Sequence, residues 1–233
     1  MSLKTEIQPY IDSEGLVSPG IPTGSNNGVM YTSEYIVMLI RNGEATEADI
    51  DAYLTKMESC FVLPGLLGRH LGGTGDQEGP DDYLGLAAAL HEINNDRSKA
   101  IARSVVTYAI EHIGDMNNPD PGHFAWGAFL GRQPQLGAVF LWASGLPVGP
   151  LVRFYCAMSI LLSCKGLPAN STDPRRLSWL LIQVAASKSW ICKLASIVWY
   201  RRLYGVYPTG MKGVAQIYYQ SGHPFSKYWI DKA

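Results

Sequence analysis

The 233-residue sequence has few charged residues and almost no excess of either sign. Only 17% of its residues are charged, the formal net charge is -1, and 47% are hydrophobic. A near-neutral chain lacks the basic surface that nucleic acids require, so a nucleic-acid partner is not expected. The four cysteines form neither a C-x-x-C pair nor zinc-ligand spacing. We therefore interpret all four as reduced, buried side chains (Cys60, Cys156, Cys164, Cys192) and predict no metal site.

Long apolar runs are also missing. Residues 136–152 carry no charge, but Gly145, Pro147 and other glycines and prolines interrupt them. A spanning helix needs roughly 20 mostly apolar residues, so two shorter buried helices explain this stretch better. Lys4 and Glu6 precede no apolar segment of the signal-peptide type, so no signal peptide is expected. A cytoplasmic and a virion-associated location both stay open.

No sustained alternation of apolar and polar residues indicates strands, whereas helical spacing recurs along the chain. Thr46 and Asp49 resemble a capping box before a helix that Pro64 would end, and Thr32 or Ser33 would cap the helix before it. The remaining helices are expected at about 80–93, 96–112, 123–130, 134–143, 149–164, 175–203 and 211–220. We predict an all-α fold of antiparallel helix pairs, either a bundle or an incomplete α/α toroid.

A single domain, 1–233, is expected, with an irregular segment over about residues 1–30. Prolines and glycines break this segment, and turns are indicated at Asp12–Leu16 and Asn26–Gly28.

Two loop-to-helix stretches carry a resemblance. Asn27-Gly28-Val29-Met30-Tyr31-Thr32-Ser33-Glu34-Tyr35 and Gly79-Pro80-Asp81-Asp82-Tyr83-Leu84-Gly85-Leu86 resemble segments of α/α-toroid proteins that act on carbohydrates, which include glycoside hydrolases and polysaccharide lyases. Some phage-encoded helical proteins contain segments that these two stretches also resemble. The resemblance implies a cleft lined by loops at one end of the toroid, here residues 25–35, 69–83 and 117–126.

Asp81 and Asp82 are the first candidates for catalysis in such a cleft. Each could act as a general acid or base, or could cap the helix that begins beside it. Glu34 is the candidate for the second carboxyl group that glycoside hydrolysis uses. A solvated glutamate in the first turn of a helix is the alternative interpretation of Glu34.

A polysaccharide lyase could use four side chains of this sequence: Arg69, His70, Tyr83 and His123. Arg or His can neutralise a uronate carboxylate, and Tyr or His can remove the neighbouring proton. A surface arginine and a structural histidine are the alternative.

The glycine-rich loop at 72–79 does not indicate a cofactor. It lacks the phosphate-loop pattern, and its acids miss the spacing of a calcium loop. It could be a mobile lid over a site or an ordinary loop. Asp76 and Gln77 in this loop, Asn27, and Trp126, whose ring could stack on a sugar, are the remaining candidates for substrate binding.

The leading hypothesis is therefore a carbohydrate-active or carbohydrate-binding helical protein, a hydrolase or lyase of a polysaccharide with no cofactor. The rival is a non-catalytic phage or virion component, or another protein-interaction module. Low charge and an aromatic C-terminal tail would then serve an interface, which includes the option of a homo-oligomer.

Overall fold

A computed structural model describes residues 2–17, 28–68, 71–73, 80–111 and 134–147, together with positions 150, 151, 154, 158 and 201. The chain divides into two compact units, Met1–Leu146 and Pro147–Ala233, and almost all described residues belong to the first. The single domain stays a prediction. The helices expected at 123–130 and 211–220, and most of those at 149–164 and 175–203, lie outside the described residues, as do Cys156, Cys164 and Cys192.

The described part is mostly helical, at 74% helix, with one short antiparallel hairpin. The expectation of no strands is therefore wrong for one segment. The α-helices are α1 (Leu3–Ile7), α2 (Gly28–Asn42), α3 (Glu47–Ser59), α4 (Pro80–Ile93), α5 (Asp96–Glu111) and α6 (Pro134–Ala143). The strands are β1 (Phe61–Leu63) and β2 (Leu66–Leu67), and the 3-10 turns are η1 (Gln8–Tyr10) and η2 (Leu71–Gly73).

Capping residues lie at several helix boundaries. Thr46 and Asp49 form the predicted capping box before α3. Asn95 and Ser98 form a second reciprocal pair before α5, with Asn95 Oδ1 accepting from the Ser98 N–H at 2.7 Å and Ser98 Oγ accepting from the Asn95 N–H at 3.0 Å. Gly43, at φ +71°, follows α2.

Two predicted boundaries are wrong. Helix α3 ends at Ser59 rather than at Pro64, because the chain turns into the hairpin at Phe61 and Pro64-Gly65 forms the hairpin turn. Helix α2 begins at Gly28, so Thr32 lies inside it and does not cap it. The Thr32 hydroxyl instead donates to the Gly28 carbonyl at 2.6 Å, which is the back-bonding expected of threonine within a helix.

Helix α4 is the centre of the described fold. Its residues from 82 to 91 are all buried, as expected of a helix that is apolar on every side. Helix α2 packs along it in parallel: the starts meet where the Met30 N–H donates to Asp82, and the ends meet where Arg41 pairs with Glu92 at 3.1 Å. The two backbones approach closely at Gly85, where a β-carbon would lie 2.8 Å from the Met30 Cα.

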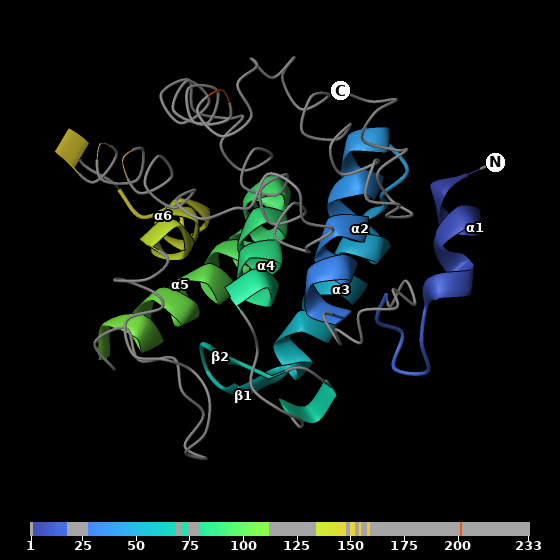
Figure 1. The fold of residues 1–233 in the computed structure, drawn as a ribbon, viewed down its shortest axis with the longest axis horizontal. Helices are drawn as coiled ribbons and strands as arrows, with labels where there is room; N and C mark the ends of the chain where they lie inside the picture. The colour runs from blue at the N-terminus through green and yellow to red at the C-terminus, as the bar shows by residue number, and fades with distance from the viewer. Residues whose placement is uncertain are drawn as a thin grey trace. The chain divides into compact units, whose positions relative to one another are not determined.

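The helices alternate between two rows as the chain proceeds. Helices α2, α4 and α6 are neighbours in one row, with α4 between the other two (Figure 1). Helices α3 and α5 form the other row. Helix α3 contacts α2 and α5, and α5 also contacts α4 and α6. Row neighbours α2 and α4 are parallel, whereas α2 and α3 are antiparallel because only residues 43–46 join them.

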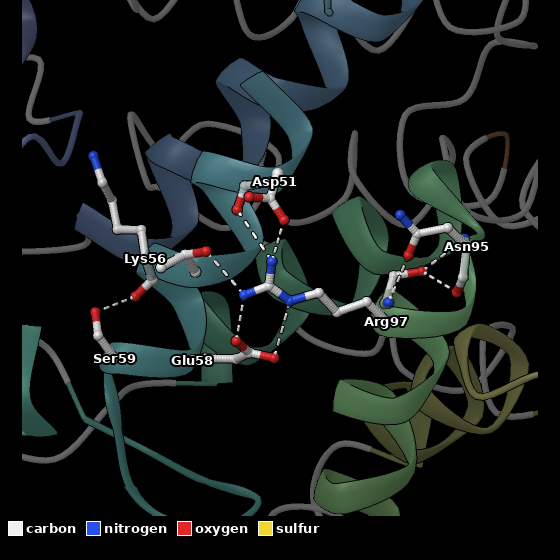
Figure 2. Close-up of polar contacts among 8 residues, drawn as sticks. Asp51, Lys56, Glu58, Ser59, Asn95 and Arg97 are labelled. Atoms are coloured by element: carbon white, nitrogen blue, oxygen red, sulfur yellow. Dashed lines mark hydrogen bonds and ion pairs between the residues drawn. The ribbon is translucent and has the colours of Figure 1, made fainter. Parts of the chain in front are cut away.

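Arg97 links the two helices of the second row at their solvent-exposed side. Its guanidinium, from the first turn of α5, lies between Asp51 and Glu58 of α3 (Figure 2). It also donates to the Thr55 hydroxyl at 2.9 Å. The planar guanidinium can serve several acceptors at once, which the lysine ammonium cannot do in the same geometry.

Within the predicted irregular stretch, residues 2–17 contain regular structure, namely α1, η1 and a turn. Helix α1 buries Leu3 and Ile7, and its Leu3 N–H donates to Glu44 at 3.0 Å. Lys4 pairs with Asp49 at 2.6 Å. The partners of Leu3 and Lys4 lie more than 40 residues away in the sequence, so no local pattern indicates them. The prolines and glycines nearby were the only local signal, and they predicted irregular structure.

Gly85→Ala should destabilise the fold, although alanine normally favours a helix by about 1 kcal/mol over glycine. The added β-carbon collides with the α2 backbone, and overpacking of this kind typically costs about 1–3 kcal/mol. Urea denaturation would measure the change in the free energy of unfolding. The control is Ala100→Gly on the exposed face of α5, which would measure the difference in helix propensity between alanine and glycine alone. A Gly85→Ala variant as stable as the wild type would show that the two helices are not in close contact.

The Lys4 ammonium and then Thr46 lower the pKa of Asp49 to about 2, from its ordinary value of 3.8. This carboxylate therefore stabilises the fold above about pH 4, and its contribution is lost as the pH falls toward 2. Lys4→Met should raise the Asp49 pKa, as followed by carboxyl NMR titration. Lys99→Met, which removes the same charge elsewhere, should leave it unchanged; an unshifted Asp49 in Lys4→Met would contradict the pairing.

Candidate functional site

The predicted site residues separate into a buried group and a group outside the described chain. Asp82, Tyr83 and Glu34 are buried, and Asp81 lies in the first turn of α4. The others lie outside the described residues: Asn27, Arg69, His70, Asp76, Gln77, His123 and Trp126. The structure therefore describes only the helix-borne candidates, and the roles predicted for all of these residues stay predictions.

Asp82 is completely buried and its Oδ1 accepts a hydrogen bond from the Met30 N–H at 2.9 Å. Met30 is the third residue of α2, and the first four N–H groups of a helix have no acceptor within it. Asp82 thus supplies from α4 the cap that α2 needs. The prediction was that Asp82 caps α4, the helix that begins beside it; the hydrogen bond goes instead to α2, where Met30 lies 52 residues earlier in the sequence.

Glu34 is also completely buried, in the second turn of α2. The expectation of a solvated, first-turn glutamate is wrong, because α2 begins at Gly28 and not at Thr32. Glu34 follows Met30 by four residues and so lies on the same side of the helix, the side that faces α4. Two carboxyl groups from different helices therefore occupy the α2–α4 interface.

Tyr83 joins α4 to the hairpin and to α6. Its hydroxyl oxygen accepts from the Leu67 N–H at 2.8 Å, and its ring meets Phe140 edge-on with centroids 6.1 Å apart. The side chain is 1% exposed. Asp82 and Tyr83 thus each bind a backbone N–H of a different segment, which fixes the positions of α2 and β2 against α4.

A charged group that sequence reasoning missed lies near Cys60. Glu14 Oε2 accepts from the Leu71 N–H at 3.3 Å, and the Lys56 ammonium donates to the Gly15 carbonyl. Burial, the Glu14 charge and, more weakly, the Asp82 charge raise the pKa of the Cys60 thiol to about 12, while Lys56 lowers it in part. Cys60 is therefore a buried thiol that stays protonated, as predicted for the cysteines.

The only sequence signal for this group was the turn at Asp12–Leu16. The structure confirms that turn: Asp12 Oδ1 accepts from the N–H groups of Glu14 and Leu16, both at 2.9 Å, and Gly15 has φ +73°. The turn then meets α3 and η2, which are distant in sequence. Nothing in the local pattern indicates those partners.

Within the described residues, no three His, Cys, Asp or Glu side chains form a group that could hold a metal ion. In that same part of the chain, no helix has the length and apolar character needed to cross a membrane. No protein-family model, curated protein or solved structure matches the chain.

Asp82→Ala should destabilise the protein by about 2–3 kcal/mol, because it leaves the buried Met30 N–H without its acceptor. Asp82→Asn should cost less, since the amide oxygen can still accept that hydrogen bond. Chemical denaturation would measure both. The control is Asp96→Ala at the exposed start of α5, expected to cost no more than about 1 kcal/mol; an equal loss in Asp82→Ala and Asp96→Ala would refute the buried cap.

Proposed function

We propose that the chain is a carbohydrate-active or carbohydrate-binding helical protein, built as an incomplete α/α toroid, whose cleft lies at the end where α2 and α4 begin. The observation that carries the proposal is the Asp82–Met30 hydrogen bond, because it holds the starts of two parallel helices side by side. The polar loops that precede Gly28 and Pro80 therefore enter the fold at the same end.

The alternation of the helices in two rows supports the toroid part of the proposal. In an α/α toroid, successive helices alternate between an inner and an outer ring. The described helices alternate in the same way, with the heavily buried α2 and α4 in one row and α3 and α5, which keep exposed residues, in the other. We therefore assign α2, α4 and α6 to the inner ring.

The burial of Asp82, Tyr83 and Glu34 assigns them to the frame of the cleft in this proposal. A substrate in solvent does not reach fully buried carboxylates, and Asp82 is engaged by a backbone N–H. We assign proton transfer to Asp81 and His70 and neutralisation of a uronate carboxylate to Arg69. Substrate contacts are assigned to Asn27, Asp76, Gln77, His123 and Trp126.

The test is a depolymerisation screen over neutral and uronate-containing polysaccharides, reading new reducing ends and the absorbance of unsaturated uronates. Wild type should cleave at least one class, and Asp81→Asn and His70→Ala should each reduce the rate by about 100-fold or more at unchanged stability. Asp82→Asn is the matched control beside Asp81→Asn. Asp82→Asn should lower the free energy of unfolding. Its cleavage rate, measured where the protein is folded, should fall much less than that of Asp81→Asn.

The same protein samples test the rival interpretation, a non-catalytic phage or protein-interaction component. If the wild type neither cleaves nor binds any polysaccharide in the panel, the carbohydrate proposal fails. A stable assembly in light scattering would then favour the non-catalytic component of a phage particle or of another protein complex.

A further inference from the structure

Two cations of α5, Lys99 and Arg103, lie against the turn that ends α6. They are four residues apart on one helix, a spacing that places their β-carbons about 6 Å from each other. The Arg103 Nε–H donates to the Ser144 carbonyl at 2.9 Å. The aliphatic part of Lys99 packs on Gly145, where a β-carbon would lie 3.2 Å from the Lys99 Cδ. The residues that follow α6 therefore hold both side chains in place.

These two side chains keep hydrogen-bond donors that no described residue uses. Within the described residues, the Lys99 ammonium has no hydrogen-bond or ion-pair partner, and Arg103 donates through its Nε–H alone. The two terminal nitrogens of the Arg103 guanidinium are thus unused, and the Arg103 side chain is exposed. The other cations of α1 to α5 each have an acceptor, either a carboxylate or a carbonyl: Lys4, Arg41, Lys56 and Arg97.

The dipole of α6 accounts for only part of this positive charge. A cation near the carboxyl end of a helix offsets the negative end of its dipole, and Arg103 does this for α6 through the Ser144 carbonyl. Lys99 adds a second positive charge, and like charges four residues apart destabilise a helix. Asp96, the acid one turn before Lys99, forms no ion pair with it. Two adjacent cations without a counter-charge favour an anion that contacts both.

We propose that the Lys99 ammonium and the terminal nitrogens of Arg103 form a binding site for one oxyanion group, a carboxylate or a sulfate. A guanidinium can donate two parallel hydrogen bonds to such a group, and an ammonium adds a compact charge beside it. Helix α5 begins just after α4 ends, and the 14 residues of α4 span about 20 Å. The anion site is therefore remote from the start of α4 and independent of the cleft proposed there.

The experiment titrates sodium sulfate, and separately sodium glucuronate, into the full chain at an ionic strength held constant with sodium chloride. NMR would follow the Gly145 N–H and the Arg103 Nε–H. In the wild type, both signals should shift to saturation with at least one of the two anions. Lys99→Gln should weaken that binding about tenfold, because it removes a charge-assisted hydrogen bond. The melting temperature of Lys99→Gln should match the wild type, since no described contact of the ammonium is lost.

Arg97→Gln is the matched control, because it removes the same charge from the same helix. Asp51 and Glu58 already engage the Arg97 guanidinium, so anion binding should be unchanged in this variant. Glucose, which resembles glucuronate but carries no charge, should shift neither NMR signal.

Binding of glucuronate would assign the site to a carboxylate, and binding of sulfate alone would assign it to a tetrahedral oxyanion. Either result supports the proposal. Shifts that grow in proportion to anion concentration without saturating, or affinities that are equal in wild type and Lys99→Gln, would overturn it. Arg103 would then act only as a cap of α6. The polysaccharide screen has a separate readout, so failure of the cleft proposal would leave this result unaffected.

Discussion

The described fold depends on one hydrogen bond between two parallel helices. Parallel neighbours cannot be joined by a tight turn, so the chain must pass through α3 and the hairpin before α4 can lie beside α2. Asp82 then satisfies an N–H at the start of α2, and Gly85 lets the two backbones come together one turn later. The carboxylate lies near the positive ends of both helix dipoles, which compensates in part for its removal from water.

In our proposal, this arrangement separates the frame of the candidate cleft from its reactive groups. Asp82 and Tyr83 use their polar atoms to hold α2 and β2, so buried groups fix the backbone at the start of α4. Glu14, from outside the helix pair, accepts the Leu71 N–H at the start of η2. Binding sites need such support, because loop residues act only when their backbone is held in a productive geometry.

Sequence reasoning was most accurate where the determining contacts are local. The span of α4, the Thr46–Asp49 capping box and the Asp12–Leu16 turn follow from neighbouring residues, and the structure confirms them. The hairpin was missed because its two strands are too short to show alternation. The partners of Asp82 and Glu14 could not be predicted, because Met30 and Leu71 lie 52 and 57 residues away along the chain. The same non-local packing decided that Glu34 is buried.

The most direct test of this account is the exchange of the Met30 amide proton with solvent, followed by NMR in the unmodified protein. An N–H in the first turn of a helix usually exchanges rapidly, since helix ends fray and lack internal acceptors. If Asp82 caps α2, Met30 should exchange as slowly as the core amides of α4, through global unfolding. Rapid exchange at Met30, at the rate of an open helix end, would contradict the central role of the Asp82 carboxylate.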